Sequence, residues 1–142
     1  MTEHTGLKCK LKSGGLLILR VLMGLGMAYH GYQKVFGGIM PRMAEGLTQM
    51  GMPAPTIMAW LAGLAELVGG LFIAIGLGTR ISAFFVFVTM AVAFFWAHAK
   101  DPFQVKELAF LYGAVALSFV FTGGGRFSID SLICCRKCSK SA

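Results

Sequence analysis

Four apolar runs, each long enough to cross a lipid bilayer as a helix, dominate this sequence. They lie at about residues 14–36, 55–77, 80–98 and 105–122. A helix needs about 20 residues to cross the hydrocarbon layer, with a usual range of about 17–25. The runs do not alternate apolar and polar residues as barrel strands would, and a helix satisfies its own backbone within lipid. The sequence therefore predicts an all-α polytopic membrane protein with four transmembrane helices in an antiparallel bundle.

The composition excludes a soluble or disordered chain. Hydrophobic residues make up 56% and charged residues 13% of the 142 residues, whereas an average soluble domain has about 45–50% and about 25%. A soluble domain of this size needs far more polar surface, and a disordered chain is far less apolar. We predict one membrane domain at 14–133, a basic N-terminus at 1–13 and a cysteine-rich basic tail at 134–142.

The connector at 37–54 is too polar and too often interrupted by glycine and proline to cross the membrane. It suits an interfacial or re-entrant segment between the first two helices, with a short helix near residues 41–50. The remaining connectors are short turns, so consecutive helices are expected to be antiparallel neighbours.

The basic residues predict the orientation. With a cytoplasmic N-terminus, eight of them fall on the cytoplasmic side: Lys8, Lys10, Lys12, Arg80, Arg126, Arg136, Lys137 and Lys140. Four fall on the other side: Lys34, Arg42, Lys100 and Lys106. This bias predicts that both termini are cytoplasmic. The net charge of +7 favours the lipid bilayer as a partner, and the scatter of the basic residues argues against nucleic acid.

Ionisable side chains inside the runs are the candidate functional residues. Each costs about 2.5–3.5 kcal/mol at mid-bilayer on insertion scales, so each needs a partner or a cavity. Glu66 lies at the centre of the second run, Arg20, His30 and Lys34 lie in the first, and His98 closes the third. We take Glu66 and His30 as candidate catalytic residues for proton exchange, and Arg20, Lys34 and His98 as candidate substrate-binding residues.

Two interpretations of these charges stay open. Helical spacing places Arg20 on a glycine-rich stripe of the first helix and Glu66 on a stripe of small residues on the second, so both face a close helix interface. In the structural interpretation, an Arg20–Glu66 ion pair fixes the register of the two helices. In the functional one, Glu66 with His30 and His98 lines a proton-accepting pocket open to the outer face, because histidine titrates near neutral pH.

The cysteines are weak candidates for metal ligands. They are Cys9, Cys134, Cys135 and Cys138. Cys135 and Cys138 have CxxC spacing, but they stand in a tail on the predicted cytoplasmic side, where thiols stay reduced. No metal site and no cofactor site is evident in the sequence. A solvated tail beside the membrane is the simpler interpretation.

The chain resembles the DoxX family of small four-helix membrane proteins over about residues 14–133. The resemblance is carried by Arg20 and by the stretches at 31–38, 51–53, 61–80 and 106–130. It implies a bundle in the inner membrane of a bacterium. The family includes relatives of a thiosulfate:quinone oxidoreductase subunit and members linked to redox enzymes and oxidative stress.

The resemblance and the buried charges together predict a redox-associated membrane subunit that binds a quinone or another small apolar substrate. A non-enzymatic scaffold or assembly partner of a redox complex is the main alternative, and a proton-coupled transporter is a weaker one. The sequence leaves open whether the chain is an enzyme, whether it has a redox enzyme partner and whether it forms a homo-oligomer.

Overall fold

The computed structural model describes residues 3–133, with side chains from Lys12 onward. Its helices are α1 (Glu3–Phe36), α2 (Met40–Gln49), α3 (Pro55–Ile75), α4 (Thr79–Val92), the π-helical η1 (Ala93–Ala97) and α5 (Phe103–Thr122). Within the described residues, four segments are long and apolar enough to cross a membrane: Lys12–Phe36, Pro55–Ile75, Thr79–Ala97 and Phe103–Thr122. The predicted all-α fold with four membrane helices is confirmed.

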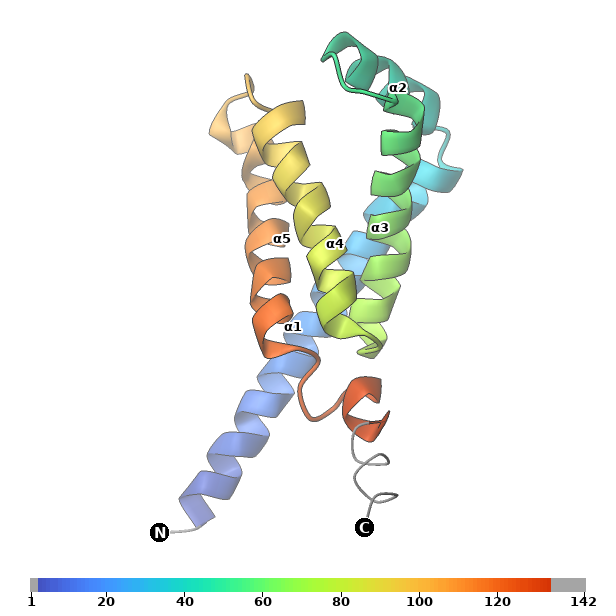
Figure 1. Cartoon of the computed structure of the whole chain (residues 1–142). Helices are drawn as coiled ribbons and strands as arrows, with labels where there is room; N and C mark the ends of the chain where they lie inside the picture. Colours follow the sequence, from blue (N-terminus) through green and yellow to red (C-terminus); the bar gives the residue numbers. More distant parts are fainter. Residues whose placement is uncertain (1–2, 134–142) are drawn as a thin grey trace.

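The short helix predicted between the first two membrane helices is present as α2, and it packs against α3 at one end of the protein (Figure 1). Helix α1 is longer than predicted. It begins at Glu3, so the predicted boundary at residue 13 falls inside it, and its first turns project beyond the other helices (Figure 1). Lysine and leucine, which are good helix formers, continue the helix through this segment.

The membrane helices pack as two pairs. Helix α1 packs mainly against α3, and α5 packs against α4, while α3 and α4 join the two pairs. The turn between α3 and α4 is tight because Gly76 and Gly78 have φ values of 77° and 55°, which glycine adopts without steric cost. The core that joins the pairs is apolar, with Met27, Val86 and Phe119 almost fully buried.

Helix α4 changes to a π-helix over its last turn. In η1 the N–H of His98 donates to the carbonyl of Ala93 at 2.9 Å, a bond that spans one residue more than in an α-helix. Such π-helical segments are rare in proteins, and those that occur are often found at functional sites. The change sets the position of His98, the first residue after η1.

Close contact between α1 and α3 depends on glycine. A Cβ atom on Gly24 would lie 2.6 Å from the backbone of Ala74, and one on Gly70 would lie 2.5 Å from the backbone nitrogen of Ala28. Gly31 lies equally close to the backbone of Leu67. Small residues allow such an approach between membrane helices. The packed interface predicted from the two small-residue stripes is therefore present.

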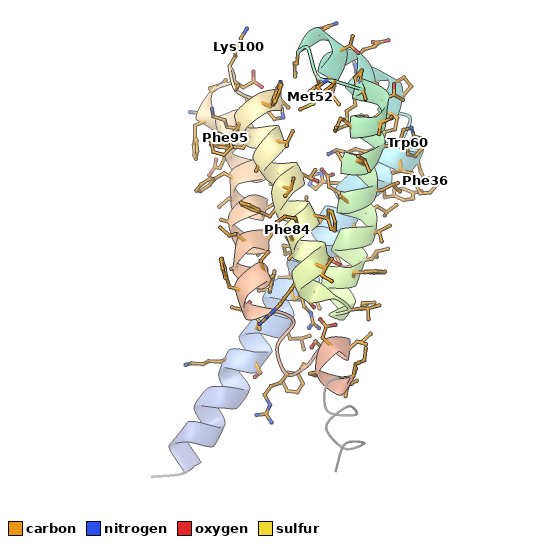
Figure 2. The ribbon with its side chains drawn as sticks, in the orientation of Figure 1. Phe36, Met52, Trp60, Phe84, Phe95 and Lys100 are labelled. Atoms are coloured by element: carbon orange, nitrogen blue, oxygen red, sulfur yellow. The ribbon has the colours of Figure 1, made fainter. Side chains whose placement is uncertain are left out.

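Many large apolar side chains point away from the bundle, as expected for helices in lipid. Figure 2 shows Phe36, Trp60 and Phe95 directed outward, and their exposed fractions are 68%, 44% and 75%. A soluble protein of this size rarely leaves so many large apolar groups uncovered. These surfaces are therefore expected to face the bilayer.

The substitution Gly31→Ala tests the α1–α3 contact. The new methyl group would meet the backbone of Leu67, which cannot rotate away, so the two helices must separate. We expect a loss of about 1–3 kcal/mol of stability, measured as a lower Tm and a lower folded yield in detergent. Gly15→Ala is the matched control, because a Cβ at Gly15 meets nothing within 4 Å. Equal Tm values for the two variants would contradict the close contact.

Candidate functional site

Glu66 and Lys34 form an ion pair between α3 and α1. The Nζ atom of Lys34 lies 2.5 Å from Oε1 of Glu66, and the exposed fractions of the two side chains are 27% and 1%. Lys34 comes from α1 and Glu66 from α3, so the glycine-mediated approach of the two helices brings them together. The predicted pair between Arg20 and Glu66 is wrong, because Glu66 binds Lys34.

Arg20 lies at the other end of α1 and holds the segment that follows α5. Its Nη1 atom donates to the carbonyl of Gly124 at 2.6 Å, and its Nη2 atom donates to the carbonyl of Phe127 at 2.8 Å. The side chain is only 2% exposed. Arg20 therefore connects the first membrane helix to the last segment that the structure describes.

The register of α1 and α3 explains why Arg20 misses Glu66. Gly24 lies against Ala74, and Gly31 lies against Leu67. Arg20, one turn before Gly24, therefore comes beside Gly76 at the end of α3. Relative to a register that aligns the centres of the runs at 14–36 and 55–77, these glycine contacts shift α1 along α3 by more than one helical turn.

Asp130 completes this end of the protein by binding the start of α4. Its carboxylate accepts hydrogen bonds from the N–H of Gly78 at 2.7 Å, the N–H of Thr79 at 2.9 Å and the hydroxyl of Thr79 at 2.8 Å. Partial burial opposes ionisation, but these hydrogen bonds and the charge of Arg20 outweigh it and hold the pKa of Asp130 below its ordinary value of 3.8. An anion at a helix N-terminus is also favoured by the helix dipole.

This lowered pKa predicts how stability depends on pH. Because the pKa of Asp130 is lower in the folded chain than in the unfolded one, its stabilisation is complete above the unfolded value and is lost as the pH falls through the folded value. Thermal unfolding in detergent from pH 3 to 7 should show Asp130→Asn less stable than wild type at pH 7. The difference should shrink below pH 3.8.

Glu45→Gln serves as the control, because Glu45 is exposed on α2 and surface substitutions change stability by about 0.5 kcal/mol or less. A difference between wild type and Asp130→Asn that stays constant down to pH 3 would show that the carboxylate charge is not what stabilises this end.

A large apolar groove lies on one side of the Lys34–Glu66 pair. Its volume is about 870 Å³, and it runs between α3 and the continuous α4–η1 segment, with α2 and the α2–α3 loop at one end. Met52 of that loop stands near the mouth (Figure 2). The polar residues of its wall are few: Lys34, Glu66, Ser82 and Thr89. Apolar walls with a few polar groups are typical of small-molecule sites.

A smaller cavity of about 150 Å³ lies on the other side of the pair. Its polar wall is formed by His30, Lys34, Glu66, His98 and Tyr112. The rings of His30 and Tyr112 meet edge to face, with centroids 5.8 Å apart. The structure thus gathers titratable groups from α1, α3, the turn after η1 and α5 around one space.

His98 stands at the rim of this small cavity and binds Asp101. The Nδ1 atom of His98 lies 2.7 Å from Oδ2 of Asp101, and the side chains are 40% and 44% exposed. A carboxylate at one ring nitrogen orients the imidazole and fixes which nitrogen carries the proton.

Four of the five predicted site residues therefore meet around the two cavities, namely His30, Lys34, Glu66 and His98, while Arg20 lines neither. The prediction missed Tyr112 and Asp101. Both could have been recognised from the sequence. Tyr112 is a polar aromatic residue in the middle of an apolar span, and Asp101 follows His98 by three residues. Nothing in the sequence indicated the groove, because its shape depends on how α3 and α4–η1 diverge and on where α2 lies.

Most of the predicted metal ligands lie outside the described residues. Cys134, Cys135 and Cys138 are outside the described residues, and only the backbone of Cys9 is described, in α1. Within the described part of the chain, no group of three or more His, Cys, Asp or Glu side chains is placed to hold a metal ion. The titratable side chains around the two cavities can form hydrogen bonds and exchange protons.

The Lys34–Glu66 pair predicts an asymmetry between single and double substitutions. Lys34→Met leaves the carboxylate buried without a countercharge, which typically costs about 3–5 kcal/mol, whereas replacing both charges with apolar groups is often neutral. We expect Lys34→Met to lower the Tm in detergent and Lys34→Met with Glu66→Met to restore it. Lys100→Met, at an exposed position, is the control. A double variant as unstable as the single one would contradict the pairing.

Comparison with known proteins gives a consistent family. The model of the family described as DoxX matches residues 15–99. An uncharacterized protein of Haemophilus influenzae is 34% identical over 123 residues, which cover 82% of this chain and 88% of that protein. "Inner membrane protein YqjF" of Escherichia coli is 30% identical over 128 residues, which cover 87% of this chain and 95% of that protein.

A more distant relative has a name that refers to chemistry. "Putative oxidoreductase CatD" of Bacillus subtilis is 29% identical over 122 residues, which cover 84% of this chain and 87% of that protein. No solved structure matches the chain.

Proposed function

This chain belongs to the DoxX family of multi-pass inner membrane proteins, and we propose that it is a redox-associated member that binds a quinone or a similar small apolar molecule in the groove between α3 and α4. The observation that carries the proposal is the Lys34–Glu66 pair, which stands as an isolated charged group in the wall of an otherwise apolar groove. The relative named as an oxidoreductase supports the association with redox chemistry.

The groove fits a ligand with an apolar body and a compact polar head. Its volume of about 870 Å³ lies in the range of about 300–1,000 Å³ that small-molecule sites occupy. The ring and tail would pack on the apolar side chains of α3 and α4. The polar head would lie at Lys34 and Glu66, because a ligand's polar oxygens gain most where the wall offers a charge.

Residues on the far side of the pair suit proton exchange. His30, Tyr112 and His98 line the small cavity together with Glu66, and His98 and Asp101 are exposed enough to exchange protons with water. In this proposal Glu66 and His30 exchange protons with the ligand, Lys34 positions its head, and His98 passes protons at the rim. With both termini in the cytoplasm, this rim faces the periplasm. Any electron carrier would belong to a partner protein.

A titration with decylubiquinone in nanodiscs of neutral lipid tests the groove. Trp96 lines it, so in a Trp60→Phe background bound ligand should quench Trp96 in a saturable way. Ala65→Phe places a ring inside the groove, and we expect it to weaken binding at least about ten-fold, equivalent to about 1.4 kcal/mol.

Ala114→Phe is the matched control, because Ala114 is exposed on α5 and outside the groove. Empty nanodiscs correct for partition of the ligand into lipid. Absence of saturable quenching by both decylubiquinone and its reduced form, or equal binding by the Ala65→Phe and Ala114→Phe variants, would contradict the proposal.

The main alternative is a non-enzymatic scaffold whose groove receives a helix of a redox enzyme. The open, apolar form of the groove favours it as the second candidate, because a partner helix could bury the same side chains. The alternative predicts that Ala65→Phe disrupts recovery of a specific partner in a pull-down while decylubiquinone does not compete.

A further inference from the structure

We infer that the ligand head bound at Glu66 is a hydrogen-bond donor, a hydroxyl group such as that of a quinol or phenol, and that the site discriminates against the corresponding carbonyl form. This inference rests on the proposed function of the groove and specifies the chemistry of its ligand. The atom that carries it is Oε2 of Glu66.

The two carboxylate oxygens of Glu66 have different surroundings. Oε1 accepts a hydrogen bond from Lys34. Oε2 is buried and, among the residues that the structure describes, has no hydrogen-bond partner. The residue is only 1% exposed and lines both cavities. A buried carboxylate oxygen without a donor is costly, so a ligand that brings a donor to it gains more than one that does not.

Three other polar side chains of the two walls are directed elsewhere, namely Thr89, His98 and Tyr112. The hydroxyl of Thr89, also in the groove wall, donates to the carbonyl of Phe85 at 3.0 Å. His98 is bound to Asp101. The hydroxyl of Tyr112 lies beside Gly26, so close that a Cβ atom at position 26 would collide with the hydroxyl. Oε2 is therefore a buried acceptor that no side chain among the described residues satisfies.

The acceptor at Oε2 separates the two redox forms of a quinone ring. A quinone head carries only carbonyl acceptors, and a carbonyl oxygen placed against a carboxylate oxygen is repelled. A quinol hydroxyl donates to Oε2 and can still accept a hydrogen bond from Lys34, whose ammonium group has three N–H donors. Lys34 can serve either form, so the bond to Oε2 is what distinguishes them.

The test compares three ligands on the wild-type chain in neutral-lipid nanodiscs under anaerobic conditions. They are decylubiquinol, decylubiquinone and the dimethyl ether of decylubiquinol, which keeps the reduced ring but has no hydroxyl donor. A hydrogen bond to a charged group typically changes binding by about ten-fold or more. We expect decylubiquinol to bind at least about ten-fold more tightly than both others, as measured by equilibrium titration against empty nanodiscs.

The substitution Glu66→Gln tests the atom itself. The amide keeps the shape of the side chain but replaces one acceptor oxygen with an NH₂ donor, so the preference for the quinol should fall to less than about three-fold or reverse. Glu45→Gln, the same change at an exposed site on α2, should keep the full preference. If Glu66→Gln does not fold, the comparison of the three ligands on the wild-type chain still tests the inference.

Each outcome separates this inference from the proposed function. Binding of quinol and quinone with similar affinity, or tighter binding of the quinone, would overturn the inference and leave the groove as the binding site. Tight binding of the dimethyl ether would overturn it as well, because that ligand has no donor. If none of the three ligands binds, the proposed function fails together with the inference.

Discussion

The close approach of α1 and α3 is the contact on which the rest of the structure depends. Gly24, Gly31 and Gly70 leave no room for a side chain between the two backbones. The helices therefore pack in this register and not in registers shifted by a turn. That register decides which charges meet. It places Lys34 at Glu66, and it carries Arg20 past the end of α3 to the segment after α5. Because interiors are closely packed, a shift of one turn would separate both sets of partners at once.

The same register divides the buried charges into two kinds. Arg20 and Asp130 bind backbone groups at one end, where the α3–α4 turn and the segment after α5 meet. Their partners are fixed parts of the chain, so their role is structural. Lys34 and Glu66 instead stand between two cavities, and one oxygen of Glu66 has no partner among the described residues. A stabilising pair alone would not require open space on both sides, and for this reason the proposed chemistry is placed at Glu66.

The helices could be predicted because span length and hydropathy are local properties of the sequence. The small-residue stripes were also visible, since helical spacing is local. The partner of Glu66 was not predictable, because it depends on which glycine meets which across α1 and α3. Tyr112 was missed although it interrupts an apolar span. The groove could not be predicted from the sequence. Its shape depends on the position of α2, on the π-helical η1 and on the separation of α3 from α4, and none of these follows from a local sequence pattern.

In the proposed function, the Lys34–Glu66 pair keeps two routes apart. An apolar ligand reaches the pair from the groove between α3 and α4, whose wall offers almost no polar group for a proton to follow. Protons reach it from the opposite side, through the cavity of His30 and Tyr112 to the exposed His98. A carboxylate buried in a bilayer is expensive, yet it is the group that both routes share. In this proposal, lipid-soluble and water-soluble reactants meet at Glu66, a buried side chain that is paired through one oxygen and has no partner at the other among the described residues.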